Sequence, residues 1–176
     1  AASMATEIVR AWKKETGLDI HEAYGMTESA SMVTYNHYHR HVIGSVGTVA
    51  NLVEVKICDP AGRPLPSGQQ GEICIRGPNI TKGYLNQPDE TRAAFRGDWF
   101  RSGDIGYLDE QSYLFIVDRL KDMVITGGEN VYPREVEEVL YTHPHVQECA
   151  VVGLPDAEYG EKVTAFIVPA PSVEPD

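Results

Sequence analysis

The stretch DRLKDMVITGGENVYP (residues 118–133) divides this chain of 176 residues into two halves of different pattern. Before it, from about Ile43 to Val117, apolar and polar residues alternate with a period of two, which is typical of strands that bury one face. Its own later residues predict a strand at Met123–Thr126, a Gly-Gly turn and a helix that begins at Pro133. Four of its first five residues are charged, so we predict a hinge at residues 118–121.

The half before the hinge contains two parts of an α+β fold. Residues 1–42 are interpreted as the end of an α/β layer. They contain a helix whose apolar residues run from Ala5 to Trp12 and which Gly17 ends, followed by a short strand at Asp19–Glu22. Residues 43–117 are expected to form a β-barrel-like subdomain, in which one helix near Pro88–Phe95 interrupts strands separated by turns rich in glycine and proline.

The half after the hinge, residues 122–176, is expected to form a small βαβ-like α+β part. The helix that begins at Pro133 should end at His143-Pro144, because proline cannot continue a helix. The runs Glu148–Val152 and Val163–Val168 are mostly apolar and β-branched, so we predict two buried strands.

The composition excludes several classes of function. The chain has 15 Lys and Arg against 26 Asp and Glu, a formal net charge of −11, so its field repels nucleic acid and anionic membranes. No apolar run is long enough to cross a bilayer, and the N-terminus lacks the pattern of a signal peptide. The three cysteines show no metal-binding spacing. We therefore expect no transmembrane segment, no nucleic-acid partner and a cytoplasmic location.

The pentapeptide Tyr24-Gly25-Met26-Thr27-Glu28 combines groups that suit a nucleotide and a metal ion. An aromatic ring can stack on a purine, and a threonine hydroxyl can donate to a phosphate oxygen. A glutamate can hold Mg²⁺, a cation that prefers oxygen ligands. A plain loop explains the same five residues equally well.

Three further places in the sequence suit a bound ligand, and each has a simpler alternative. Asp104 follows a glycine turn and can accept both hydroxyls of a ribose, or cap the turn. The cationic side chains of Arg119 and Lys121 can face a ligand, or belong to a solvated turn. Gly127 and Gly128 let a ligand approach the backbone closely, or form a hairpin turn.

In this order, the motifs resemble those of the adenylate-forming enzymes: acyl-CoA synthetases, aryl-CoA ligases, firefly luciferase and the adenylation domains of peptide synthetases. The resemblance covers effectively the whole chain, and the form of residues 124–133 is most similar to that of the fatty-acid-CoA ligases. The motifs that carry it are residues 24–28, GEICIRGP at 71–78, GYLN at 83–86, SGD at 102–104, DRLK at 118–121 and residues 127–137.

The resemblance implies an ATP-dependent reaction in two steps. A carboxylic acid, expected to be a medium- or long-chain fatty acid, becomes an acyl-adenylate with release of pyrophosphate, and coenzyme A then takes the acyl group. It also implies the end of a large N-terminal domain, a hinge and a truncated C-terminal domain. For the nucleotide, the resemblance implies that Tyr24, beside Gly25 and Met26, stacks on adenine, and that Asp104 and Arg119 bind the ribose. Thr27 would contact phosphate and Glu28 would bind Mg²⁺. Lys121 would be the hinge, and Gly127 and Gly128 would flank a pantetheine channel.

Two lysine-bearing segments of the family, a phosphate loop expected upstream and a Ser-Gly-Lys segment expected downstream, are not in this sequence. We therefore expect a fragment that is inactive alone and that self-associates through surfaces the rest of the enzyme would cover. Three alternatives stay open: a non-catalytic nucleotide-binding or interaction module, a ligase for aromatic acids or acyl carrier protein, and a luciferase-like oxygenase.

The histidines His37, His39 and His41 alternate along the chain, so an extended segment would place them on one face as a zinc or nickel site. No carboxylate or thiol joins them in sequence. A polar loop or a wall of the acyl pocket is the preferred interpretation.

The glutamates Glu135, Glu137 and Glu138 suit acid–base chemistry by residue type. They share a helix with the apolar residues Val136, Val139 and Leu140, and they lie on its polar side. A solvated helix face is therefore the preferred interpretation.

Overall fold

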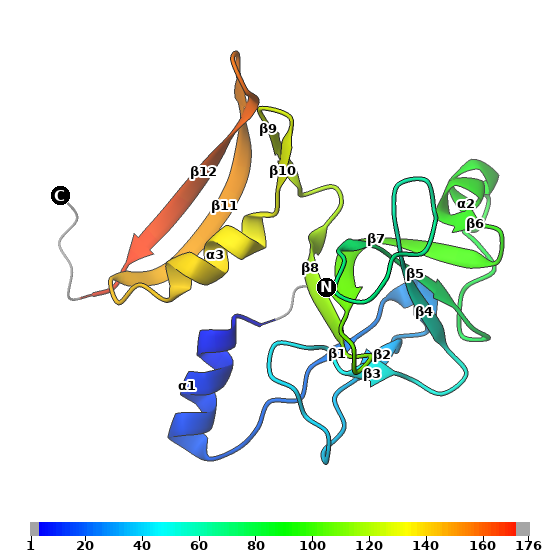
Figure 1. The fold of residues 1–176 in the computed structure, drawn as a ribbon, viewed down its shortest axis with the longest axis horizontal. Helices are drawn as coiled ribbons and strands as arrows, with labels where there is room; N and C mark the ends of the chain where they lie inside the picture. Colours follow the sequence, from blue (N-terminus) through cyan, green and yellow to red (C-terminus); the bar gives the residue numbers. More distant parts are fainter. Residues whose placement is uncertain (1–3, 172–176) are drawn as a thin grey trace.

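Antiparallel sheet makes up most of the regular secondary structure. The computed structural model describes residues 4–171 and has the α+β fold that the sequence predicts (Figure 1). Its helices are α1 (Thr6–Thr16), the 3-10 helix η1 (Thr27–Ser29), α2 (Pro88–Ala94) and α3 (Pro133–Tyr141). Its strands are β1 (Ala23–Tyr24), β2 (Thr34–Tyr35), β3 (Thr48–Val49), β4 (Glu54–Cys58), β5 (Gly71–Arg76), β6 (Phe95–Arg96), β7 (Trp99–Leu108), β8 (Leu114–Arg119), β9 (Val124–Thr126), β10 (Glu129–Val131), β11 (Val146–Asp156) and β12 (Gly160–Pro169). None of the helices in the described region is long and apolar enough to cross a membrane.

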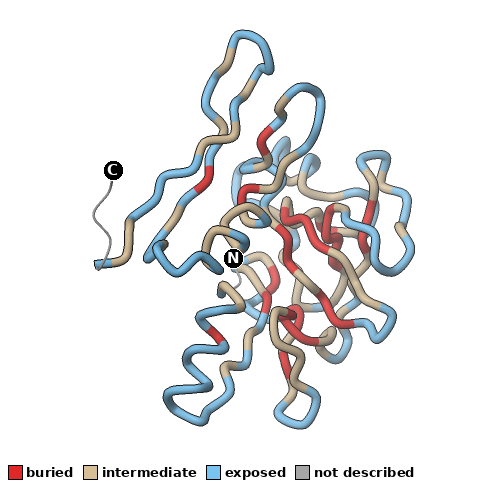
Figure 2. Tube along the Cα trace, turned by 60° about the vertical axis from the view of Figure 1, so that its left-hand side comes forward, coloured by how far each residue is buried: buried red, intermediate tan, exposed pale blue. Residues whose placement is uncertain are grey.

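The middle of the chain forms a five-stranded antiparallel sheet in the order β4-β5-β7-β6, with β8 also paired to β7. The period-two alternation predicted these strands. The prediction that they bury one face only is wrong for β5, in which Glu72 and Cys74 are also buried, at 9% and 4% exposed. Ile57, Ile73 and Ile75 are 3%, 0% and 0% exposed, and Leu114 of β8 is 0% exposed. Figure 2 shows the buried residues gathered in this half of the molecule. The hydrophobic effect of this burial stabilises the sheet that carries the candidate site.

The strand predicted at Asp19–Glu22 is wrong, because pairing begins only at β1, where Ala23 lies opposite Tyr35. Asp19 forms an ion pair with Lys13 at 2.7 Å. Glu22 Oε1 accepts a hydrogen bond from the backbone N–H of Met4 at 2.8 Å. Side-chain contacts therefore hold this segment as a connection, while β1, β2 and β3 form a small antiparallel sheet.

The helices begin and end close to where the sequence predicts. α1 ends at Gly17 as predicted, and the φ of 73° at this residue is the left-handed conformation that glycine adopts easily. α2 and α3 both begin at a proline, which suits the first helical position because its missing N–H has no partner there anyway.

The C-terminal part is a four-stranded antiparallel sheet in the order β10-β9-β12-β11, beside which α3 lies (Figure 1). β11 and β12 form a long hairpin, with Gly160 of β12 opposite Asp156. The prediction that these two strands are buried is wrong: Val151 is their single buried residue. The reason is that α3 packs against β11, whereas β12 keeps Phe166 57% and Ile167 49% exposed.

Candidate active site

The chain from β1 to Val33 folds back on itself in a tight turn around η1. The N–H of Val33 donates to the carbonyl of Tyr24 at 2.8 Å, and the N–H of Ser31 donates to that of Met26 at 3.1 Å. A Cβ on Gly25 would lie 1.7 Å from the Ser31 carbonyl oxygen, so only glycine lets the two backbone segments pass this closely. The turn itself therefore requires Gly25, whatever ligand it contacts.

Tyr24 and Asp104, 80 residues apart, form a buried hydrogen-bonded pair. The two residues are 1% and 4% exposed, and the Tyr24 hydroxyl donates to Asp104 Oδ2 at 2.6 Å. Burial and the charge of Asp104 raise the pKa of Tyr24, so the phenol stays protonated and remains a donor. The ring is buried and does not line the cavity described below, and its role in stacking on adenine stays a prediction.

Asp104 lies within strand β7 rather than after a glycine turn as predicted, and side chains hold this part of the strand. The Asp104 N–H donates to Ser102 Oγ at 3.0 Å. Glu72 accepts hydrogen bonds from Arg101 Nε at 2.9 Å and from the Gly103 N–H at 3.3 Å. Glu72 belongs to the GEICIRGP motif, but the sequence showed no partner for it. Its carboxylate fixes the strand segment from which Asp104 extends.

A cavity of about 500 Å³ opens beside Asp104. On β8, directly opposite in register, Arg119 places its Nε 3.5 Å from Asp104 Oδ1, and Lys121 follows in the next turn. The cavity therefore brings a buried acceptor and two cations together, as a nucleotide requires. The residues that line it are Gly25, Met26, Glu28, Tyr84, Phe100, Arg101, Ser102, Gly103, Asp104, Arg119, Leu120 and Lys121.

Glu28 lies at the wall of this cavity and is held by Tyr84. The Tyr84 hydroxyl donates to Glu28 Oε1 at 3.0 Å across 56 residues of sequence. Burial, and next the hydrogen bond to Glu28, raise the pKa of Tyr84, so this phenol too remains a donor. Tyr84 belongs to the GYLN motif, but the sequence alone indicates no role for it, since no local pattern connects it to Glu28.

Four predicted site residues lie outside this cavity: Tyr24, Thr27, Gly127 and Gly128. Thr27 is exposed and does not line it. Gly127 and Gly128 form the two-residue turn between β9 and β10, with φ values of 58° and 86°. Two successive residues with positive φ define a type I′ hairpin turn, so the turn alone explains both glycines. The roles of these residues toward phosphate and pantetheine stay predictions.

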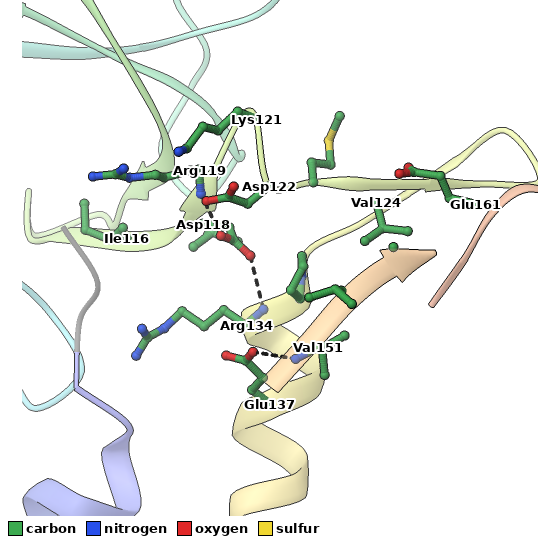
Figure 3. Close-up of a pocket in the computed structure, with 15 residues that line it drawn as sticks. Ile116, Asp118, Arg119, Lys121, Asp122, Val124, Arg134, Glu137, Val151 and Glu161 are labelled. Atoms are coloured by element: carbon green, nitrogen blue, oxygen red, sulfur yellow. Dashed lines mark hydrogen bonds between the residues drawn. The ribbon is translucent and has the colours of Figure 1, made fainter. Parts of the chain in front are cut away.

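A larger cavity, of about 610 Å³, lies between residues 116–122 and the C-terminal sheet (Figure 3). At its edge Asp118 Oδ2 accepts a hydrogen bond from the backbone N–H of Arg134 at 3.1 Å. This bond satisfies one of the free N–H groups in the first turn of α3. Arg119 and Lys121 line both cavities, whereas Glu28 lines only the smaller one. The smaller cavity is therefore the candidate site.

The preferred interpretation of the α3 glutamates as a solvated face is wrong for Glu137. Its Oε1 accepts a hydrogen bond from the Val151 N–H at 2.8 Å, which ties α3 to β11 (Figure 3). Glu135 is exposed and accepts from Gln70 Nε2 at 3.1 Å, and Glu138 pairs with Arg134 at 3.4 Å. All three therefore have structural contacts rather than positions in the candidate site.

The histidine segment is not extended, so its imidazoles do not share a face. Residues 38 and 39 form a turn, closed by a bridge between His37 and Arg40. His41 instead packs against His21, with ring centroids 4.6 Å apart. Among residues 4–171 no group of three or more His, Cys, Asp or Glu side chains is placed to hold a metal ion.

Comparison with known families agrees with this geometry. The family model described as AMP-binding enzyme matches residues 1–85, and the model for the AMP-binding enzyme C-terminal domain matches residues 135–176. The chain belongs to the AMP-binding, or adenylate-forming, enzymes.

Its relatives include CoA ligases for different acids. A feruloyl-CoA synthase of Amycolatopsis sp. is 45% identical over 158 residues, which are 89% of this chain and 32% of that protein. A long-chain-fatty-acid–CoA ligase of Escherichia coli O6:H1 is 42% identical over 162 residues, 92% of this chain and 29% of that protein. The crystal structure of ATP-bound MatB from Rhodopseudomonas palustris matches with a TM-score of 0.95 and 42% identity, over 100% of this chain and 35% of that one. The chain thus spans about a third of the length of the curated relatives it matches.

Proposed function

We propose that the protein is an AMP-forming acid–thiol ligase, which activates a carboxylic acid with ATP and transfers the acyl group to coenzyme A. The observation that carries the proposal is the single cavity lined by Glu28, Asp104, Arg119 and Lys121, which come from three separate stretches of the chain. The CoA-ligase relatives support the same reaction class.

In the proposed first step, a carboxylate oxygen of the acid attacks the α-phosphorus of ATP, and pyrophosphate leaves. Asp104 accepts the ribose hydroxyls through Oδ1, because its Oδ2 already accepts from Tyr24. Arg119 and Lys121 offset the negative charge of the phosphates and the incoming carboxylate. In the second step the thiol sulfur bonds to the acyl carbon, and AMP leaves.

The residues present suit a magnesium ion. Glu28 is half-buried at the cavity wall, and its Oε2 makes no hydrogen bond within residues 4–171. Mg²⁺ is usually bound by one or two carboxylates together with substrate phosphates, so a single glutamate beside the triphosphate is sufficient. Bound there, Mg²⁺ would neutralise phosphate charge; Glu28 would hold it, and Thr27 beside Glu28 would contact phosphate.

The remaining assignments extend this proposal over the chain. We assign residues 1–42 to the end of an α/β subdomain, 43–117 to the barrel-like subdomain, 118–121 to the hinge and 122–176 to part of a C-terminal domain. Rotation about Lys121 would bring the turn at Gly127 and Gly128 beside the pantetheine arm of coenzyme A.

We also propose a cytoplasmic location. We further propose that the chain self-associates through exposed apolar side chains such as Phe166. Light scattering over a range of concentrations tests the self-association.

Two classes of acid are candidates for the substrate. A medium- or long-chain fatty acid is the class expected from the form of residues 124–133, and the fatty-acid–CoA ligase relative supports it. An aromatic acid is supported by the feruloyl-CoA synthase, which is 45% identical. Both classes need the same nucleotide site, so Glu28 and Asp104 do not discriminate between them.

The test is ATP–pyrophosphate exchange by the full-length protein with a panel of fatty and aromatic acids, followed by thioester formation with coenzyme A or acyl carrier protein. We expect acid-dependent exchange that requires Mg²⁺ and that Asp104→Ala abolishes. Nucleotide binding without exchange for any acid would instead favour a non-catalytic nucleotide-binding module.

A further inference from the structure

The loop from Asn79 to Tyr84 supports Glu28 by more than one contact. The Thr81 N–H donates to the backbone carbonyl of Glu28 at 2.7 Å. Asn79 Nδ2 donates to the carbonyls of Ser29 and Met32, both at 2.9 Å. The backbone around Glu28 is therefore fixed by this loop independently of the Tyr84 side chain.

The Tyr84 hydroxyl contributes something different, because it engages the carboxylate itself. It donates to Oε1 of Glu28 at 3.0 Å and leaves Oε2 without a hydrogen bond in the described part of the chain. Both residues line the candidate cavity. A carboxylate with one oxygen held and the other free is restricted in rotation, and it presents the free oxygen in a defined direction.

Tyr84 is itself held in place from the opposite side. Its backbone N–H donates to Thr91 Oγ1 of α2 at 2.9 Å, and Thr91 Oγ1 donates to the carbonyl of Gln87 at 2.8 Å. Gly83, with a φ of 143°, packs so closely that a Cβ there would lie 2.5 Å from Thr91 Cγ2. α2, the helix that begins four residues after Tyr84, thereby fixes the backbone of the tyrosine.

From this arrangement we propose that Tyr84 is a positioning residue, which orients the Glu28 carboxylate so that Oε2 faces the divalent cation bound with ATP. The proposal rests on the proposed function for the role of Glu28. It predicts that the phenolic hydroxyl affects metal affinity, whereas the fold of the loop and the affinity for metal-free nucleotide depend on other contacts.

The test compares the full-length wild-type protein with Tyr84→Phe, Glu28→Gln and the double variant. Tyr107→Phe is the matched control, because the Tyr107 hydroxyl makes no hydrogen bond within residues 4–171 and does not line this cavity. Mn²⁺ binding in the presence of ATP is measured by electron paramagnetic resonance, AMP binding without metal by calorimetry, and the Mg²⁺ dependence by ATP–pyrophosphate exchange.

We expect Tyr84→Phe to weaken Mn²⁺ binding by about tenfold, since a hydrogen bond to a charged group is lost. The Mg²⁺ concentration for half-maximal exchange should rise by the same factor, with metal-free AMP affinity unchanged. Adding Tyr84→Phe to Glu28→Gln should cause no further loss, because the tyrosine acts through the glutamate. Tyr107→Phe should match the wild type.

Three results with the variants would overturn the proposal: equal Mn²⁺ affinity in Tyr84→Phe and the wild type, a loss of metal-free AMP binding in Tyr84→Phe, or an additive loss in the double variant. The two proposals can fail separately. A wild type that shows no exchange contradicts the proposed function, while the Mn²⁺ comparison still decides the role of Tyr84. A wild type that binds no Mn²⁺ contradicts the role of Tyr84 directly.

Discussion

The middle sheet and the C-terminal sheet are both antiparallel, yet they are stabilised very differently. The first has a closed core in which Ile73, Ile75 and Leu114 are fully buried. The second packs against α3 and buries little besides Val124 and Val151. Asp104 and Arg119 extend from the first sheet, so the part of the candidate site that must stay fixed lies on the better-packed element. The part after residue 121, which we propose to rotate about Lys121, is the less tightly packed one.

The largest effect is expected at the turn beside the middle sheet. Gly25→Ala should destabilise the chain by about 4 kcal/mol or more, because the new Cβ would lie 1.7 Å from the Ser31 carbonyl oxygen. Gly68→Ala is the control, since its φ of 81° is strained for alanine but no atom lies within 4 Å of the added Cβ. Urea unfolding measures both. Equal losses for the two variants would contradict the close approach at Gly25.

Truncating one apolar side chain in each sheet compares them directly. Leu114→Ala should cost about 3 kcal/mol, because it leaves a cavity in a closed core. Ile167→Ala, at a residue 49% exposed on β12, should cost less than about 1 kcal/mol. The free energies of unfolding from urea titration give both values. Comparable losses would mean that the C-terminal sheet is as well packed as the middle one.

The hydrogen bond from the Val151 N–H of β11 to Glu137 of α3 should affect the stability of the C-terminal part alone. Glu137→Ala should raise the hydrogen-exchange rate at Val151 by roughly tenfold, since a hydrogen bond of about 1.5 kcal/mol is lost. Amides of β5 should exchange as before. Glu148→Ala is the control, because this exposed side chain makes no hydrogen bond in residues 4–171. Faster exchange throughout the chain would show that the two sheets unfold together.

The smallest expected effect is a difference in reactivity between two cysteine thiols, one in each sheet. Burial raises the pKa of the Cys74 thiol to about 12, and its residue is 4% exposed. Burial also raises the pKa of Cys149, which is only half-buried. Thiolate is the reactive form and increases with pH, so at pH 8 iodoacetamide should modify Cys149 well before Cys74. Mass spectrometry of the labelled protein decides, and faster labelling of Cys74 would contradict its burial.

Local patterns in the sequence predicted most of the elements, because local physics determines them. Pro133 marks the start of α3, and the alternation around Ile73 and Ile75 predicted a strand, although β5 is buried on both faces and not on one. The burial of β11 and β12 was mispredicted, because apolar side chains indicate what a strand prefers to cover and not whether another element is there to cover it.

The sequence predicted several residues of the candidate site, but not the contacts between them. Asp104 and Arg119 meet because β7 and β8 pair in one particular register, which no local pattern reveals. The contact of Tyr24 with Asp104 spans 80 residues, and that of Tyr84 with Glu28 spans 56. Contacts across such distances depend on how the sheets assemble, so they become visible only in the folded chain.

The central claim is that the cavity beside Asp104 binds the nucleotide. Calorimetric titration of this chain with AMP, and with ATP plus Mg²⁺, tests it directly when wild type, Asp104→Ala and Asp104→Asn are compared. We predict binding by the wild type, at least about tenfold weaker binding by Asp104→Asn, which can still accept a hydrogen bond from Tyr24, and no measurable binding by Asp104→Ala. AMP binding of equal affinity in the wild type and Asp104→Ala would place the nucleotide elsewhere and contradict the account.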